Sequence, residues 1–377
     1  MGLRLRLALT LPSPLIQLSL INFGRLTMSA FIQLHVLTSH APSNLNRDDT
    51  GRPKTALMGD ALRLRISSQS QKRAWRTSDV FEEALGDHLG ARTRMLGKEA
   101  HDLIKAAGVE DKKAREWARQ IAACFGKPKS DKKTDQDEDL QIEQLAHVSP
   151  AEHEAVLALA KACGERKAGP DEAELKLLTH EARAVDIAMF GRMLADAAEF
   201  NVEAAVQVAH AITVHRAAVE DDYFSAVDDL NPRGAGHIGE RGYGAGLFYL
   251  YVCINRDLLK ANLNGDDALT RKALDALLQA ITKVSPTGMQ NSFASRAYAS
   301  YVLAEKGAQQ PRSLSQAFIK PVKPFGAQSM LTEAIGALTK QRDNFNQVYG
   351  ACSDEHRELN AEAGTGSLQD LAAFVQG

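Results

Sequence analysis

The chain has 377 residues, of which 44% are hydrophobic and 24% are charged, and its formal net charge at pH 7 is −2. This is the composition of an ordinary globular protein, and the length leaves room for two or three domains. Four scattered cysteines without a C-x-x-C pair argue against a zinc site and a disulfide framework, and they fit a reducing cytoplasm. No stretch of 18 apolar residues is uninterrupted, so no membrane span is expected.

Residues 1–27 begin with a basic, apolar segment that superficially resembles an export signal. Pro12 and Pro14 interrupt this segment, and no A-x-A cleavage site follows it. Met28 then opens a stretch that has the pattern of a strand. We expect residues 1–27 to be a non-native or disordered extension from an upstream start codon, and an export signal is the alternative.

The chain from residue 31 onward is predicted to hold one strand and then several helices. Apolar and polar residues alternate over 31–38, which is typical of a strand. Helical patterns follow over 80–124, 140–163 and 171–181. Residues 126–139 are nearly all charged or helix-breaking, which predicts a mobile, exposed loop.

The second half of the chain alternates between strand and helix patterns. Strands are predicted over 185–193, 204–215, 246–255 and 295–304. Helices are predicted over 266–283, 326–350 and 367–376. Strands interspersed with helices and long insertions indicate an α+β sandwich rather than a repeated βαβ fold.

The segment 62–78 carries the strongest functional signal, because it holds five basic residues and no acid. These residues are Arg63, Arg65, Lys72, Arg73 and Arg76. The first two alternate with apolar residues as in a strand, and the last three would crowd one face of a following helix. Serines and Gln69 lie where that helix would begin, and a helix N-terminus suits phosphate.

Like charges this close repel one another, so their presence without acids predicts an anionic ligand. Residues 28–78 hold eight Lys or Arg against three Asp, whereas residues 79–377 are acidic overall. A polyanion responds to such a local basic surface rather than to the net charge. We interpret the segment as a site for a nucleic-acid backbone, and the alternative is a solvated basic face.

The loop over 43–54 offers two interpretations. Arg47 and Lys54 could hold phosphates while Asp48 or Asp49 binds a metal ion or transfers protons. Alternatively, the acidic side chains form turns and pair with the arginines. Two adjacent aspartates are a poor metal site without a third ligand, so we favour the structural role for both.

An acidic, glycine-rich excursion over 216–244 contains three apolar residues, Tyr223, Phe224 and Val227. An apolar tip of this kind can insert between bases or stack on them. It can equally anchor the excursion to its own core, and the sequence leaves both possibilities open. The glycines do not form a triphosphate-binding loop, because no G-K-[ST] follows them.

Five segments together resemble the CasC family, the backbone subunit of the type I-E CRISPR surveillance complex Cascade. They are FIQLHVLTSHAPSNLNRDD, RLRISSQSQKRAWR, VDIAMFGRM, AHAITVHRAAVEDDYFSAVDDL and GLFYLYVCIN. The resemblance runs from about Met28 to Phe318. It implies an α+β fold with a modified RNA-recognition (ferredoxin-like) palm, a helical fingers insertion and a long thumb hairpin. On this sequence the palm would comprise 28–79, 185–215 and 245–377 with the C-terminal helices, the fingers 80–184 and the thumb 216–244.

The resemblance further implies a non-catalytic subunit that stacks head-to-tail along a CRISPR RNA (crRNA) and presents it to target DNA. Its partners would be further copies of itself and CasA, CasB, CasD and CasE, and it would need no cofactor or metal. The RNA-binding residues expected are Arg47, Lys54, Arg63, Arg65, Ser67, Gln69, Lys72, Arg73, Arg76 and Met193. The thumb of one copy would displace a guide base at the next, with Tyr223, Phe224 and Val227 as the wedge.

Two other functions remain as alternatives at this point. In related type III complexes a backbone subunit cleaves RNA with an aspartate in a comparable loop, so Asp48 or Asp49 could serve a metal-dependent ribonuclease. The chain could also be a stand-alone RNA-binding protein.

Overall fold

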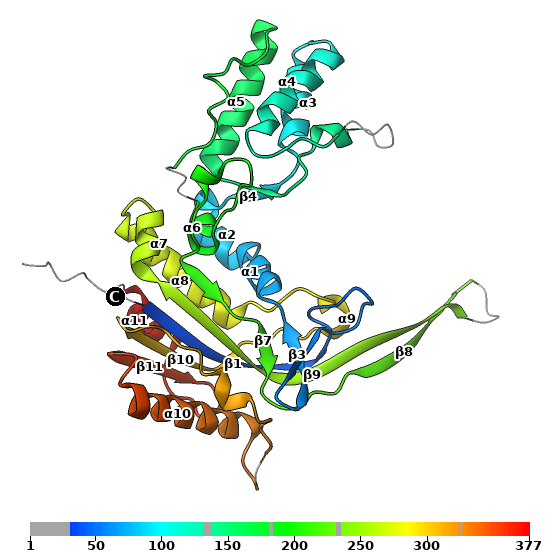
Figure 1. Ribbon diagram of the computed structural model, residues 1–377. Coiled ribbons are helices and arrows are strands. Elements are labelled where there is room, and N and C mark those ends of the chain that lie inside the picture. The colour runs from blue at the N-terminus through cyan, green and yellow to red at the C-terminus, as the bar shows by residue number, and fades with distance from the viewer. Residues whose placement is uncertain (1–30, 131–136, 181–183, 231–234, 325) are drawn as a thin grey trace, which may run out of the picture.

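A computed structural model describes residues 31–130, 137–180, 184–230, 235–324 and 326–377. The predicted extension 1–27 lies outside these residues, as do residues 131–136 of the predicted loop. The chain is an α+β protein built on one large antiparallel sheet, with a separate helical lobe and a long projecting hairpin (Figure 1).

The large sheet has the strand order β11-β10-β1-β9-β7-β3-β2, and β6 and β8 pair with β9 outside this path. Its strands are β1 (Phe31–Ser43), β2 (Thr55–Met58), β3 (Ala61–Ile66), β6 (Val206–Val208), β7 (Ala211–Thr213), β8 (Glu220–Val227), β9 (Ala235–Asn255), β10 (Ala299–Gly307) and β11 (Glu355–Asn360). The 21-residue β9 runs from the centre of the sheet out into the projecting hairpin with β8. We call that hairpin the thumb.

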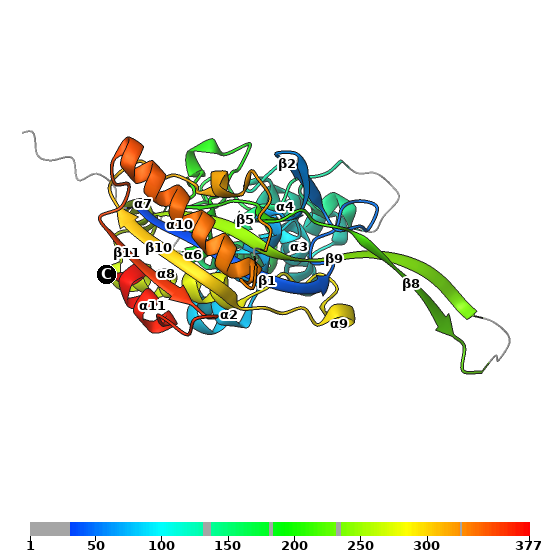
Figure 2. The ribbon, with the colours of Figure 1, turned by 90° about the horizontal axis from the view of Figure 1, so that it is seen from below.

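Both faces of the sheet are covered, which explains why six successive residues of β1, from Ile32 to Leu37, are all buried. Ile32, Leu34 and Val36 point to the core under α2 (Asp79–Leu85) and α8 (Asp267–Lys283). Alternate residues point to the other face, which α10 (Met330–Tyr349) covers. Figure 2 shows α10 lying across this second face and the thumb curving away from the sheet. Further helices that contribute to the core on the first face include α7 (Arg256–Asn262) and α11 (Leu368–Gln376), and a short α9 (Gln290–Phe293) lies near β1.

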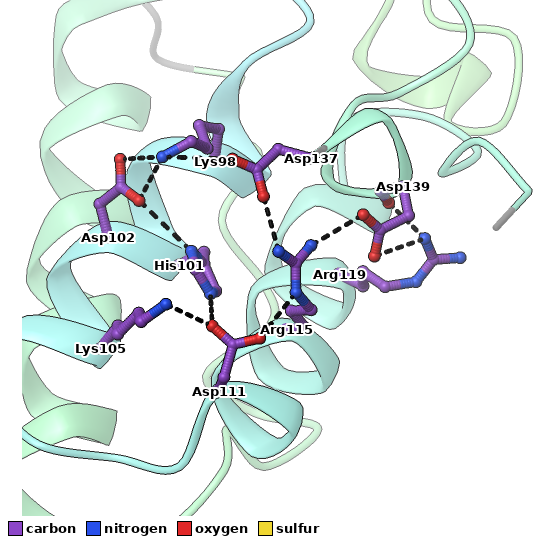
Figure 3. A network of polar contacts seen from close by, with 9 residues as sticks. All are labelled: Lys98, His101, Asp102, Lys105, Asp111, Arg115, Arg119, Asp137 and Asp139. Atoms are coloured by element: carbon purple, nitrogen blue, oxygen red, sulfur yellow. Dashed lines mark hydrogen bonds and ion pairs between the residues drawn. The ribbon is translucent and has the colours of Figure 1, made fainter. Parts of the chain in front are cut away.

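The helical lobe, which we call the fingers, has its own hydrophobic core. It comprises β4 (Ala91–Thr93), α3 (Leu96–Ala106), α4 (Asp111–Ala123), β5 (Ala146–Val148) and α5 (Pro150–Arg166). Ser149 and Glu152 form a capping box at the start of α5. Asp111 and Arg115 are the centre of an ion-pair network that joins α3, α4 and the segment from Asp137 to Asp139 (Figure 3).

Most of the predicted elements are confirmed, including the strands over 31–38 and 246–255 and the helices over 266–283, 326–350 and 367–376. The predicted strand over 185–193 is wrong, because Val185–Phe190 forms helix α6. Nearly every residue of α6 is buried, and a short apolar run gives no periodicity that separates helix from strand. The predicted helix over 171–181 is wrong as well, since residues 172–175 form a turn and residues 176–179 have no regular structure.

A buried carboxylate connects the fingers to the sheet. Asp186, on α6, accepts hydrogen bonds from the Arg76 Nε (2.8 Å) and the backbone N–H of Gly90 (2.8 Å), and its Oδ2 lies 2.8 Å from His147 Nε2. Its side chain is 1% exposed, and that of Arg76 is 10% exposed. Burial alone would raise the pKa of Asp186, but His147 and Arg76 outweigh burial and hold the pKa below its usual value.

Asp186→Asn is expected to destabilise the protein by about 3 kcal/mol, because it leaves the Arg76 guanidinium buried without its counter-charge. Urea unfolding followed by circular dichroism measures the change. Asp267→Asn, which breaks the exposed pair of Asp267 with Lys260, is the control and should leave the midpoint nearly unchanged. Equal effects from the two variants would contradict this role for Asp186.

Candidate nucleic-acid interface

The basic segment forms strand β3 and helix α1 (Ser68–Arg76), as its pattern predicts, and α1 lies between the sheet and the fingers (Figure 1). Ser67 is the N-cap: it is buried, and its hydroxyl accepts a hydrogen bond from Ser70 N–H. The N–H of Ser68 donates to His210 Nδ1 at 3.1 Å. The Ser67 hydroxyl thus closes the start of the helix as an acceptor, and its contact with RNA stays a prediction.

Arg63 is also a structural residue. Its side chain is 0% exposed, and its guanidinium donates to the carbonyls of Thr213 (2.9 Å) and Phe318 (2.8 Å). The strand alternation that suggested an exposed arginine is real, but residues near Phe318 cover that face of β3. This burial gives no support to the predicted RNA contact of Arg63.

Arg76 was expected to face an anionic ligand, and the structure places it against a carboxylate of the same chain. Asp186, which lies 110 residues away in the sequence, pairs with it inside the junction with the fingers. The segment 62–78 itself contains no acid, so its sequence gives no sign of this partner. The pair with Asp186 gives Arg76 a structural role, and its phosphate contact stays a prediction.

Three residues of α1 are at least partly exposed, as contact with a ligand requires. Gln69 and Arg73 are exposed, and Lys72 is half-buried with its ammonium 5.9 Å from the centre of the Phe190 ring. Burial, followed by the nearby charge of Arg92, lowers the pKa of Lys72. Neither Lys72 nor Arg73 has an ion-pair partner among the residues that the structure describes.

The loop over 43–54 lies beside α1 and is held in place by two asparagines. Asn44 is buried and donates from Nδ2 to the carbonyls of Gly51 and Gly242, both at 2.9 Å. Asn46 accepts a hydrogen bond from Ser67 N–H through its Oδ1 at 2.8 Å. The loop therefore joins the start of α1 to the base of the thumb.

Arg47 lies exposed in this loop, between two shallow grooves. It lines one groove of about 430 Å³ together with Arg73 of α1. It lines a second groove of about 450 Å³ together with Arg52 and Arg241. The structure thus brings Arg47 and Arg73 to one groove, and adds two arginines that the sequence analysis did not select. Of these, Arg52 pairs with Asp221 at the thumb base (2.9 Å).

A second basic cluster lies at the start of α1. Arg65 is half-buried, and its guanidinium lies 3.4 Å from His210 Nδ1. Lys54 is half-buried next to it, with its carbonyl bonded to Arg65 N–H. Burial and the charges of Arg65 and Lys54 lower the pKa of His210, so this imidazole is neutral at pH 7 and accepts a hydrogen bond.

Met193 is 76% exposed, and it borders a small groove of about 100 Å³ at the fingers. The preceding Arg192 is buried and paired with Glu152 of α5 (2.7 Å), which fixes the segment that carries Met193. Such an exposed, anchored thioether suits contact with a base.

The thumb carries an exposed apolar stripe, but it differs from the predicted wedge. Tyr223 and Val227 are 68% and 75% exposed on one face of β8, and Ile238 of β9, 57% exposed, lies between them on the same face. Phe224 points to the opposite face, where the Arg241 guanidinium lies 4.4 Å from the centre of its ring. Tyr223, Phe224 and Val227 therefore do not share one face of the hairpin, because successive strand residues alternate between faces. Their role as a wedge stays a prediction.

The two aspartates of the loop differ in their roles. The Oδ1 of Asp48 accepts hydrogen bonds from the backbone and hydroxyl of Thr50 and from Arg52 N–H, which closes the loop. These bonds, with that from the Thr50 hydroxyl the strongest, lower the pKa of Asp48. Asp49 is exposed. Over the described residues, no three His, Cys, Asp or Glu side chains gather closely enough to hold a metal ion. No helix in the same ranges has the length and apolar character to cross a membrane.

Comparisons with known proteins identify the family of the chain. Residues 32–373 match the family model described as CT1975-like protein. A solved structure entitled "CRISPR RNA-guided surveillance complex, pre-nicking" is similar, with 29% identity, a TM-score of 0.78, and coverage of 92% of this chain and 100% of that chain. A second, entitled "CRISPR RNA-guided surveillance complex", shares the fold at 24% identity and a TM-score of 0.68, with coverage of 91% and 99%. No curated protein matches the sequence. The family match spans most of the chain, which therefore belongs to the CT1975-like protein family.

Proposed function

We propose that this chain is a non-catalytic backbone subunit of a type I-E CRISPR surveillance complex. In this role it binds crRNA, stacks head-to-tail with further copies of itself, and presents the guide to target DNA. The observation that carries the proposal is a group of cations on α1 and the adjoining loop: Arg73 and Arg47 line one groove, Lys72 precedes Arg73, and none of the three has an ion-pair partner among the described residues. The similarity to chains of RNA-guided surveillance complexes supports the same role.

The cations would hold the guide through its phosphates, whatever its sequence. An RNA backbone carries one negative charge per nucleotide, and each neutralised phosphate releases condensed counterions. Gln69 adds an amide beside these charges, and Arg65 with Lys54 extends the basic surface to the start of α1. Base pairing would then read the target, while the protein supplies shape and charge.

The thumb would make the contact between neighbouring copies. Its stripe of Tyr223, Val227 and Ile238 is exposed in the single chain, and such a stripe on a projecting hairpin favours burial against another surface. A hairpin that reaches from one copy to a different surface of the next gives an open, head-to-tail assembly. Met193 would pack against a base within it.

Several finer features belong to the same proposal. The sheet with α1 and α8 would be a modified RNA-recognition (ferredoxin-like) palm. The other partners would be CasA, CasB, CasD and CasE, and the complex would act in the cytoplasm. The hydrogen bonds of Asp48 to its own loop support a structural role for this residue over the ribonuclease alternative.

Removal of single cations tests the phosphate role. Lys72→Gln and Arg73→Gln should each weaken binding of single-stranded RNA and reduce the slope of log K against log salt by about 0.7. Fluorescence anisotropy titrations at several salt concentrations measure this. Lys340→Gln removes an exposed charge from α10 on the other face of the sheet and should leave the slope unchanged. A slope that stays constant in the Lys72 and Arg73 variants would refute the proposed contact.

Replacement of the thumb stripe separates assembly from RNA binding. Val227→Ser and Ile238→Ser should reduce the number of copies bound per RNA, as counted by native mass spectrometry, without a change in salt slope. Leu57→Ser is the matched control, because Leu57 is 77% exposed on β2 and lies outside the thumb. The role of the stripe fails if the stripe variants load as many copies as the unsubstituted protein.

A further inference from the structure

The base of the fingers presents a cation that the basic segment of the sequence does not include. Arg92 lies in β4, directly opposite His147 of β5, so the two side chains share one face of this small sheet. His147 points from that face to the junction, where its Nε2 lies 3.1 Å from the Arg76 guanidinium. Arg92 is exposed at the edge of the same junction.

The carboxylate of the junction cannot neutralise Arg92. Asp186 receives Arg76 and His147 at Oδ2 and the backbone N–H groups of Gly90 and Ile187 at Oδ1. Both oxygens are therefore occupied by groups that hold the fingers to the sheet. Within the described residues Arg92 has no ion-pair partner.

Lys72 faces the same junction from α1. It lies one turn before Arg76 on the same face of the helix, with its ammonium beside the Phe190 ring. Arg76 lies 3.1 Å from His147, and the strand pairing places Arg92 opposite His147, so Lys72 and Arg92 border one junction from two lobes. The contribution of the Arg92 charge to the lowered pKa of Lys72 agrees with this placement. Among the described residues neither cation has an ion-pair partner.

We propose that Lys72 and Arg92 form a two-cation phosphate site that spans the junction, with Arg92 as a guide contact supplied by the fingers. The inference rests on the proposed function and extends it, because it makes the fingers part of the RNA path. Arg76 is the positioning residue of this site: its pair with Asp186 fixes the distance between α1 and β4. An RNA phosphate is the fitting ligand, since one anion between the two cations removes their repulsion.

The test compares charge removal on the fingers at two places. Arg92→Gln should lower RNA affinity several-fold and reduce the salt slope by about 0.7, and Arg92→Lys should restore most of the slope because it keeps the charge. Lys113→Gln removes an exposed cation from α4 and should change neither. Melting temperatures should stay unchanged, because Arg92 makes no hydrogen bond to another described side chain.

A second readout needs no RNA. In Arg92→Gln the pKa of Lys72 should rise, so Lys72 should react more slowly with an amine-acylating reagent, as followed by mass spectrometry of the labelled peptide. An unchanged salt slope, or an unchanged reactivity of Lys72, in Arg92→Gln would overturn the inference. The proposed function would still stand after that result if Lys72→Gln weakens RNA binding. If the unsubstituted protein binds no RNA, the proposed function fails and this site fails with it.

Discussion

The buried carboxylate of Asp186 is the constraint on which the rest of the site depends. It gathers groups from α1, β5 and the Gly90 segment at one point, and it thereby fixes the fingers against the sheet. Breaking such a pair is costly because each partner is desolvated, so the junction holds a single geometry. Because Arg76 and His147 already contact this carboxylate, it is not available to a further cation at the junction. The cations that remain, Lys72 on one side and Arg92 on the other, are left for an external anion.

The loop over 43–54 has a comparable role at the other end of α1. Asn46 holds the start of the helix, Asn44 holds the carbonyl of Gly242 in the thumb strand, and Arg52 pairs with Asp221 of the opposite thumb strand. The same loop therefore holds both the groove lined by Arg47 and the base of the thumb. A shift of the loop on RNA binding would alter both the contacts of Arg47 and the direction of the thumb. This gives a physical route from guide binding to the contact between copies.

The sequence predicted the architecture well and the individual contacts less well. Alternation and capping residues identified β1, β3, α1 and α8, because those elements depend on local patterns. The partners of Arg63 and Arg76, the Phe318 carbonyl and Asp186, were not predicted because they come from distant parts of the chain. Ile238 and Arg92 were missed because only cross-strand register places Ile238 beside Tyr223 and Val227, and Arg92 opposite His147. The charge pattern of the sequence thus identified the basic surface, whereas contacts between distant parts of the chain determine which cations are exposed on it.

The central claim is that copies of this chain line up on a guide RNA at regular intervals. Nuclease footprinting of RNA that co-purifies with the protein, expressed with a CRISPR array and the neighbouring subunits, tests it most directly. The account predicts protected segments of equal spacing along an RNA of guide length. RNA of random length without regular protection would identify a generic RNA-binding protein, and the absence of RNA would contradict the proposed function.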